Sequence, residues 1–435
     1  MKSLADWLEF LESLHPKGQD GIELGLERVA RVKAGLRQRQ ACPLIVVGGT
    51  NGKGSACAYL EAIYRAAAYR VGCYTSPHLL AYNERVRVDG APVDDAGLCA
   101  AFARVEAARR AAGDVALTYF EFGTLAAWEV FAAARAQAVI LEVGLGGRLD
   151  AVNVYDADVA VVTGVALDHT GWLGPDREAI GFEKAGIFRG GRPAICADAS
   201  PPQSLLAHAR AIDAGLRLIG RDFAYERAQE GWSYRDRQGA RREALPLPAL
   251  PGEHQLGNAS AALAAIDALR DRLPVPLQAI RDGLRQVRLA GRFQRVRERP
   301  AVVLDVAHNP QAMACLADNL DAMGVFRRTF AVVGMLADKD IAGSLQTLVG
   351  RIDAWLLAGL NTPRGAAAET LAAAVEAGHP GARVECFPSP AEAFWRAMGL
   401  AEENDRIAVF GSFHTVAAIL REIGRDRQDW PDAHC

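Results

Sequence analysis

The sequence predicts an α/β protein of two domains, because short apolar runs alternate with helix-compatible segments along most of the chain. Such runs are typical of strands that are buried on both faces of a parallel sheet. A second observation is the junction after the run 44–47, which passes directly into Gly48-Gly49, with helical sequence resuming after Ser55. Strand, glycine loop and helix in this order begin an α/β domain.

The first predicted element is an amphipathic helix whose apolar residues recur at helical spacing. These residues are Leu4, Trp7, Leu8, Leu11 and Leu14. A second helix is expected over residues 26–36. Further buried strands are predicted at residues 71–74, 139–141 and 159–162.

Residues 221–252 turn polar and then proline-rich, which predicts a hairpin or another surface excursion. An alanine-rich helix from Asn258 to Arg270 is expected next. A boundary near Ala290-Gly291-Arg292 divides the chain into a first domain, residues 1–289, and a smaller doubly wound domain, residues 290–435. The strands of the second domain are predicted at 302–306, 330–334, 354–358, 383–387 and 406–410. The last ten residues have few apolar anchors, and we expect them to be frayed.

Composition excludes several classes of protein. The 435 residues are 50% hydrophobic, and 49 Lys and Arg nearly balance 52 Asp and Glu, which excludes a polybasic nucleic-acid-binding tail and an acidic disordered chain. No apolar run approaches the roughly 20 residues that span a bilayer, and the first residues lack the layout of a signal peptide. Eight cysteines without a C-x-x-C pair indicate a reducing compartment. We therefore expect a cytoplasmic globular enzyme without nucleic-acid or membrane partners.

The strongest local signal is the loop Gly49-Thr50-Asn51-Gly52-Lys53-Gly54-Ser55. A glycine loop between a strand and a helix turns backbone N–H groups toward one point, and the helix N-terminus adds positive charge. Lys53 is expected to reach the β- and γ-phosphates of a nucleotide, and the Ser55 hydroxyl to bind Mg²⁺. In the usual pattern Ser or Thr follows the lysine directly, whereas Gly54 intervenes here. We interpret the loop as a nucleotide site rather than an ordinary turn.

Polar residues follow three predicted strands. Ser76 lies in the segment 75–78 after the strand 71–74, Glu142 opens a second glycine loop, and Asp168-His169 follow the strand 159–162. A hydroxyl, a carboxylate and an imidazole at adjacent strand ends can share a divalent metal. A histidine ligand is unusual for Mg²⁺, so Mn²⁺ is a plausible substitute. Each residue alone would fit a capped turn, and the segment 83–88 would fit a charged edge strand.

Spacing leaves the roles of several other charged residues open. The pair Glu183-Lys184 in a helical stretch is typical of a solvated salt bridge. Asp305, at a strand end, can accept a hydrogen bond from a ribose hydroxyl or cap the helix that follows. Arg292 can bind phosphate or stabilise developing charge. The segment 411–414 is either a helix cap or an anion site.

Taken together and in order, these motifs resemble the folylpolyglutamate synthase family of the Mur ligase superfamily, and within it the bifunctional bacterial branch. The resemblance covers roughly residues 4–424. The matching segments are Gly49–Ser55, Thr75–Leu79, Asn83–Arg85, Glu142–Ala151, Asp168-His169, Glu183–Ile187, Asp305–Pro310 and Gly411–Val416. It implies a P-loop NTPase-like ATPase domain and a smaller Rossmann-like glutamate-ligase domain.

The resemblance also implies site residues. The catalytic group is Lys53, Lys184, His169 and Arg292, and the ATP contacts are Gly49, Thr50, Asn51, Gly52, Lys53, Gly54, Ser55, Asn258, Arg292 and Asp305. Two Mg²⁺ ions would be bound by Ser55, Ser76, Glu142, His169 and Lys184, the lysine as a carbamate. The pterin pocket would comprise Ile22, Glu23, Leu24, Thr118, Tyr119, Phe120, Glu121, Leu149, Asp150 and Ala151. Phe120 is suited to stack on a flat pterin ring.

The implied activity is ATP-dependent addition of L-glutamate to 7,8-dihydropteroate and to tetrahydrofolate through an acyl phosphate, with ADP and phosphate as products. The resemblance also implies a monomer. The chain departs from the family at Val152, usually Thr, and at Ala290, usually Pro. Two alternatives remain: a folylpolyglutamate synthase of the same family with one activity, and a P-loop ATPase switch without ligase activity.

Overall fold

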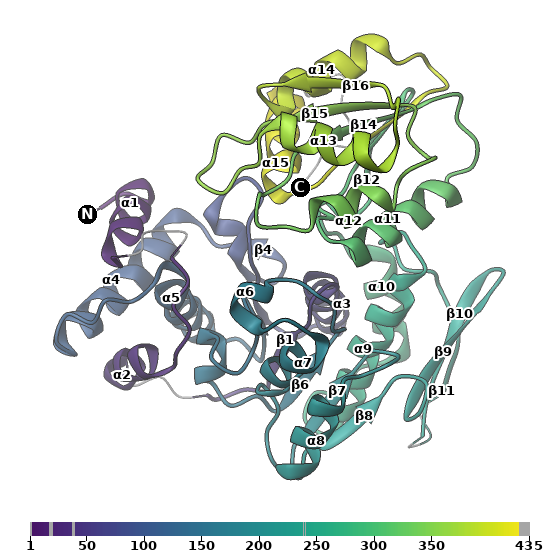
Figure 1. Ribbon diagram of the computed structural model, residues 1–435. Helices are drawn as coiled ribbons and strands as arrows, with labels where there is room; N and C mark the ends of the chain where they lie inside the picture. Colours follow the sequence, from purple (N-terminus) through teal and green to yellow (C-terminus); the bar gives the residue numbers. More distant parts are fainter. Residues whose placement is uncertain (1, 17–20, 37–39, 238, 240, 426–435) are drawn as a thin grey trace. The chain divides into compact units, whose positions relative to one another are not determined.

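The computed structural model describes residues 2–16, 21–36, 40–237, 239 and 241–425. The chain forms two compact units, one of residues 1–249 and 255–287 and the other of residues 250–254 and 288–435. The fraying predicted for residues 426–435 falls outside the described residues. Both units are built on sheets whose strands are mainly parallel, which confirms the predicted α/β class (Figure 1).

The first unit contains an eight-stranded sheet in the order β4-β3-β2-β5-β1-β6-β7-β8. From β2 to β8 neighbouring strands are parallel, whereas β3 and β4 extend one edge in antiparallel pairing. The strands are β1 (Leu44–Gly48), β2 (Val71–Tyr74), β3 (Val86–Val88), β4 (Ala91–Pro92), β5 (Ala138–Glu142), β6 (Val159–Val162), β7 (Pro193–Cys196) and β8 (Gly215–Leu218).

Helices cover both faces of this sheet, which explains why β1, β5 and β6 are buried along their whole length and carry only one charged residue, Glu142 at the end of β5. One face packs on α1, α2, α4 and α5 around Trp7, Phe102 and Phe122, and α3 packs with α10 on the other. The helices of the unit are α1 (Leu4–Leu14), α2 (Glu27–Leu36), α3 (Lys53–Ala66), α4 (Asp95–Ala111), α5 (Tyr119–Ala133), α6 (Thr170–Leu173), α7 (Arg177–Ala185), α8 (Gln203–Ala211), α9 (His254–Ala268) and α10 (Leu277–Gln286), with 3₁₀ turns at Tyr82–Arg85 and Ala151–Val154.

The register of the central strands aligns their carboxyl ends along the same side of the sheet. Tyr74 of β2 pairs with Leu141 of β5, Val47 of β1 pairs with Glu142, and Gly48 pairs with Val162 of β6. The segments that follow these four strands therefore leave the sheet side by side. Ligand sites of open α/β sheets form at this edge.

The polar segment 221–252 contains a separate antiparallel sheet rather than a single hairpin. Its strands are β9 (Phe223–Ala228), β10 (Gly231–Asp236) and β11 (Arg241–Leu245), with β10 in the centre. An ion pair between Arg242 of β11 and Asp267 of α9 attaches the sheet to the unit. Helix α9 begins at His254, four residues before the predicted start.

The second unit is a six-stranded sheet in the order β12-β13-β17-β14-β15-β16. Only β12 is antiparallel to its neighbour. Helices α11, α12 and α13 form one hydrophobic core with the sheet. The elements are β12 (Gln294–Glu298), β13 (Ala301–Leu304), α11 (Pro310–Ala322), β14 (Thr329–Val333), α12 (Ile341–Gln346), β15 (Ala354–Ala358), α13 (Ala368–Gly378), β16 (Val384–Phe387), α14 (Pro390–Leu400), β17 (Arg406–Phe410) and α15 (Phe413–Arg425).

Among the described residues, no helix is both long enough and apolar enough to cross a membrane.

The ion pair between Arg242 and Asp267 leads to a stability prediction. Both side chains are largely buried, so Asp267→Ala leaves an unpaired guanidinium inside the unit. We expect this change to lower the free energy of unfolding by about 3 kcal/mol in urea denaturation. The control is Glu243→Ala, which breaks the exposed pair with Arg241 and should cost less than about 1 kcal/mol. Equal effects of the two changes would contradict this account.

Candidate active site

The glycine loop after β1 adopts a backbone conformation that would not accommodate a side chain at Gly49 or Gly52. Gly49 and Gly52 have φ angles of +141° and +87°. A Cβ on Gly49 would lie 2.0 Å from Thr163 Oγ1, and one on Gly52 would lie 2.4 Å from Asn258 Oδ1. Gly52 directly precedes α3, so the loop leads its backbone N–H groups into a helix N-terminus, where an anion is favoured.

The loop is fixed by hydrogen bonds to the segment after β6. Thr50 N donates to Gly164 O over 2.8 Å, and Thr50 Oγ1 accepts from Ala166 N over 3.0 Å. Thr163 Oγ1 lies 2.6 Å from Asn51 O, to which it donates. These contacts attach the loop after β1 to the segment after the neighbouring strand β6.

Lys53, the first residue of α3, folds back over the same loop. Its Nζ donates to Gly49 O and Thr50 O, over 3.0 and 3.1 Å. Ser55, the third residue of α3, is buried, and Gln255 of α9 donates to its hydroxyl over 3.4 Å. Asn258 donates to Gln255 in turn, over 3.1 Å. The structure therefore brings together the predicted nucleotide contacts of the first unit.

The segment after β2 is attached to the end of β5. Ser76 N donates to Glu142 Oε2 over 3.0 Å, and the Glu142 side chain is buried. Arg87 of β3 donates to Thr75 Oγ1 over 3.0 Å. The carboxylate of Glu84 accepts from three backbone N–H groups of residues 79–81, each over 2.7 Å. The motif Asn83–Arg85 thus supports the loop that presents Ser76, and the charged strand considered for 83–88 is limited to β3.

Lys184 is almost completely buried on α7, with 3% of its surface exposed. Burial, with the positive charge of Lys53 nearby, lowers the pKa of Lys184 to about 7. Its neighbour Glu183 pairs with Arg148 instead, over 2.7 Å. The solvated salt bridge considered for Glu183-Lys184 is therefore wrong.

His169 follows β6 and precedes α6 in a left-handed backbone conformation, with φ of +52°. Its backbone N–H donates to Asp168 Oδ1 over 2.8 Å. Asp168 also contributes to the electrostatic environment of Lys184, where its negative charge favours the ammonium. The region of Lys53, Asp168 and Lys184 is therefore one connected group of charges.

The second glycine loop, residues 144–151, is organised around the buried carboxyl of Asp150. Leu145 N donates to Asp150 Oδ2 over 2.8 Å, and Val152 N donates to Oδ1 over 3.1 Å. Burial raises the pKa of Asp150 to about 7. Phe120 lies against this loop, because a Cβ on Gly144 would approach the Phe120 ring to 2.8 Å. These contacts place the predicted pterin-stacking ring beside the loop.

Glu121 and Thr118 have structural partners in addition to their predicted role in the pterin pocket. Thr118 caps α5, and the Glu121 carboxylate accepts from Thr118 N over 2.7 Å. Arg28 donates to Glu121 over 3.0 Å and to Glu23 O over 2.8 Å. Gly25 N donates to Leu149 O over 3.2 Å. The three predicted pocket segments, 22–24, 118–121 and 149–151, are therefore linked to one another.

In the second unit, Asp305 accepts from Phe293 N and Ala307 N, over 2.8 and 2.7 Å. Burial raises the pKa of Asp305. The alternative that Asp305 caps the next helix is wrong, because Asn309 caps α11. Arg292 lies over the ring of Phe413, at 5.2 Å.

The segment 411–414, for which a helix cap and an anion site were both considered, shows the geometry of a cap. Ser412 Oγ accepts from Thr415 N over 3.0 Å at the start of α15. The Thr415 hydroxyl in turn donates to Gly334 O over 2.7 Å, which attaches the start of the helix to the end of β14.

Comparison with known proteins gives consistent results over nearly the whole chain. Residues 291–413 match the family model of the Mur ligase, glutamate ligase domain. The chain is 48% identical to the dihydrofolate synthase/folylpolyglutamate synthase of Escherichia coli K12, over 98% of this chain and 96% of that protein. The chain belongs to the dihydrofolate synthase/folylpolyglutamate synthase family.

Solved structures of this family agree with the fold. Escherichia coli FolC in complex with DHPP and ADP matches with a TM-score of 0.91 and 47% identity, covering 98% of this chain and 99% of that one. A bifunctional folylpolyglutamate synthase/dihydrofolate synthase with Mn, AMPPNP and L-glutamate bound matches with a TM-score of 0.88 and 45% identity, covering 98% of both chains.

The second of these solved structures contains Mn, and the donors in the present chain suit a divalent ion. Ser55 and Ser76 offer hydroxyls, Glu142 a buried carboxylate and His169 an imidazole, a mainly oxygen set that fits Mg²⁺ or Mn²⁺. Within the described ranges, no group of three His, Cys, Asp or Glu side chains forms a metal site. The predicted set contains only two such residues, Glu142 and His169.

Sequence reasoning missed Thr163, Gln255 and Arg87 in this family member. Thr163 directly follows the predicted strand 159–162, and this position at a strand end could have indicated that it belongs to the site. Gln255 lies in the turn of α9 that precedes the predicted helix start. Arg87 had no such signal, because its side-chain partners Thr75 and Glu61 lie 12 and 26 residues away in the sequence.

Thr163 provides a prediction for nucleotide binding. Thr163→Val keeps the shape of the side chain and leaves Asn51 O without its donor. We expect the Kd for ADP, measured by calorimetry, to rise about tenfold, which corresponds to the loss of one buried hydrogen bond. The control is Thr347→Val, directly after α12, whose hydroxyl donates to Gly343 O of that helix. An unchanged Kd in Thr163→Val would show that this anchor does not shape the loop.

Proposed function

We propose that this chain is an ATP-dependent ligase that joins L-glutamate to 7,8-dihydropteroate and to reduced folates such as tetrahydrofolate. The observation with most weight is the 48% identity to a dihydrofolate synthase/folylpolyglutamate synthase over 98% of the chain. The convergence of the phosphate loop, Glu142 and Lys184 at the edge of the first sheet supports the same conclusion.

The chemistry requires activation of a carboxylate, which is a poor electrophile for an amine in water. The γ-phosphate of ATP passes to the substrate carboxylate, giving ADP and an acyl phosphate. The neutral amine of glutamate then attacks the acyl carbon, phosphate leaves, and the nitrogen loses a proton. The protein contributes positioning and compensation of charge.

The phosphate loop is suited to the first step. Its backbone N–H groups and the N-terminus of α3 would bind the phosphates, and Lys53 would exchange its bonds to Gly49 O and Thr50 O for phosphate oxygens. In the second unit, Arg292 would bind nucleotide phosphate, and Asp305 and the loop it organises would lie near the ribose. Asn258 would contribute from α9.

Two divalent ions, Mg²⁺ or Mn²⁺, would be bound by Ser55, Ser76, Glu142, His169 and Lys184. When bound, the ions neutralise phosphate charge during transfer. Lys184 suits a carbamate because burial and Lys53 disfavour its ammonium form. Its neutral amine can add to CO₂, releasing a proton and leaving an anionic ligand.

The pterin substrate would occupy the pocket formed by segments 22–24, 118–121 and 149–151, with Phe120 against the ring. These linked segments favour a dihydropteroate site and hence both activities, rather than folylpolyglutamate synthase activity alone. We assign ATP binding to residues 1–289 and glutamate ligation to residues 290–435, and we expect a cytoplasmic monomer.

The proposed function is tested by ADP release from purified protein with ATP and Mg²⁺. We expect release to depend on L-glutamate together with either dihydropteroate or tetrahydrofolate. Glutamate-dependent release with tetrahydrofolate but not with dihydropteroate would indicate an enzyme that has folylpolyglutamate synthase activity only. ATP turnover that is indifferent to both folate substrates and to glutamate would contradict the ligase and favour an ATPase switch.

Lys53→Ala should abolish this turnover while the fold is retained. The side chain is expected to compensate phosphate charge in the transition state, and loss of such a group typically lowers the rate by a factor of about 10² or more. The measurement is glutamate-dependent ADP release, with circular dichroism as the control for folding. Near-normal turnover in the variant would argue against the assigned phosphate loop.

The carbamate on Lys184 can be observed directly. Protein equilibrated with ¹³C-bicarbonate should show a carbamate carbon resonance in its NMR spectrum, because the buried amine is largely neutral above pH 7. Lys184→Gln should lack this resonance. A fully active enzyme whose Lys184 remains a bare amine would refute carbamylation.

A further inference from the structure

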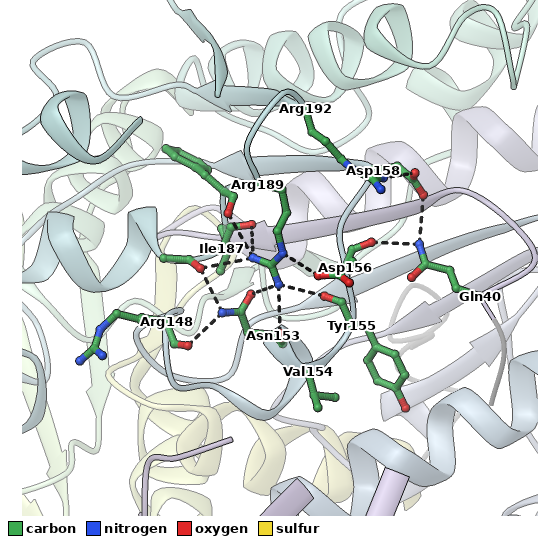
Figure 2. A network of polar contacts seen from close by, with 12 residues as sticks. Gln40, Arg148, Asn153, Val154, Tyr155, Asp156, Asp158, Ile187, Arg189 and Arg192 are labelled. Atoms are coloured by element: carbon green, nitrogen blue, oxygen red, sulfur yellow. Dashed lines mark hydrogen bonds and ion pairs between the residues drawn. The ribbon is translucent and has the colours of Figure 1, made fainter. Parts of the chain in front are cut away.

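One arginine joins the end of α7 to the segment that follows the second glycine loop. Arg189 Nη1 donates to Ile187 O and Phe188 O, over 3.2 and 3.1 Å, which are carbonyls just beyond the helix. Its Nη2 donates to Asn153 O over 3.0 Å and to Tyr155 O over 3.2 Å (Figure 2). A single planar group therefore connects two backbone segments that are more than thirty residues apart in sequence.

Asn153 makes the reciprocal connection. Its amide Nδ2 donates to Arg148 O over 2.9 Å and to Gly186 O over 3.0 Å, and its Oδ1 accepts from Arg189 over 3.0 Å. Asn153 is buried, so loss of this amide would leave carbonyl groups without a partner. Figure 2 shows the two side chains facing each other between the segments.

The backbone of the second glycine loop approaches the backbone at the end of α7 closely. Arg148 N donates to Glu183 O over 2.7 Å. A Cβ on Gly186 would lie 2.3 Å from Arg148 Cβ, and one on Gly147 would lie 2.8 Å from Glu183 O. The second glycine loop therefore lies directly against the turn of α7 that bears Lys184.

The far side of the same segment is fixed by other elements. Tyr155 stacks on Trp128 of α5 with ring centres 4.1 Å apart, and Lys33 of α2 donates to Val154 O over 2.6 Å. The segment 153–156 is thus held between α5 and α2 on one side and the end of α7 on the other. Arg189 and Asn153 supply the hydrogen bonds to the carbonyls of residues 186–188, directly after α7.

We propose that Arg189 and Asn153 are positioning residues that hold the second glycine loop against α7, so that the predicted pterin contacts 149–151 and Lys184 keep a fixed relative geometry. The inference rests on the proposed function, because it assigns the pair a role in binding the pterin substrate. Neither residue is among the predicted ligands of ATP, metal or pterin. The phosphate loop is anchored separately, by Thr50 and Thr163.

The test compares Arg189→Met with Arg192→Met. Methionine keeps an unbranched stem but removes every donor of the guanidinium. Arg192 lies three residues further along and pairs with Asp158, which also pairs with Arg272, so its loss does not touch the second glycine loop (Figure 2). Asn153→Ala provides a second variant with a smaller change, in case Arg189→Met does not fold.

The first measurement is amide hydrogen exchange, which does not depend on activity. The N–H groups of Leu145 and Val152, both bonded to Asp150, should exchange about tenfold faster in Arg189→Met and in Asn153→Ala. Those of the phosphate loop should not change, and Arg192→Met should match the unaltered protein. Unchanged exchange at Leu145 and Val152 would overturn the proposal whether or not the protein is a ligase.

The second measurement is steady-state kinetics. We expect the KM for dihydropteroate to rise about tenfold in Arg189→Met while the KM for ATP changes less than about twofold. Compared with Arg189→Met, Arg189→Lys should have a higher thermal stability, because an ammonium can donate to the carbonyls after α7. Its KM for dihydropteroate should nevertheless stay as high as in Arg189→Met. If the KM values for dihydropteroate and ATP changed equally, or if Arg189→Lys restored the KM for dihydropteroate completely, Arg189 and Asn153 would have only a structural role.

Absence of ligase activity in the unaltered protein would instead refute the proposed function, and the role in substrate binding with it.

Discussion

The hydrogen bonds between the loop after β1 and the segment after β6 are the constraint on which the candidate site depends. Thr50 and Thr163 join two adjacent parallel strands just beyond their ends, where the chain would otherwise separate into independent loops. Because the register of β2 and β5 brings Ser76 and Glu142 to the same edge, one anchored loop sets the place of the others. The conformation of the proposed phosphate loop thus rests on hydrogen bonds within the protein.

Much of this arrangement could be predicted from local sequence. Strands such as 159–162, 354–358 and 406–410 could be predicted with the bounds they have, because short, mainly apolar runs bounded by polar residues or glycine have few other stable placements. The phosphate loop was recognisable because backbone conformations such as those of Gly49 and Gly52 require glycine. The order of the motifs was enough to identify the family, which the comparisons confirmed.

Features that depend on distant partners could not be predicted in this way. The pairing of Glu183 was misread because its partner, Arg148, is thirty-five residues away, and Asp305 stabilises a loop rather than a helix start. The sheet of β9–β11 appeared only as a polar excursion, since its strands are partly exposed and carry many charged residues. Burial of Lys184 had no local signal, because the elements that cover it are brought there by the fold.

The hydrogen bonds from the segment after β6 are expected to fix the conformation of the proposed phosphate loop whether or not nucleotide is bound. Crystal structures of the protein without ligand and with a non-hydrolysable ATP analogue test this expectation most directly. We expect Thr163 Oγ1 to stay within hydrogen-bond distance of Asn51 O, and Thr50 N of Gly164 O, in both structures. A loop that is disordered or differently bonded without nucleotide, and becomes ordered only in the complex, would contradict it.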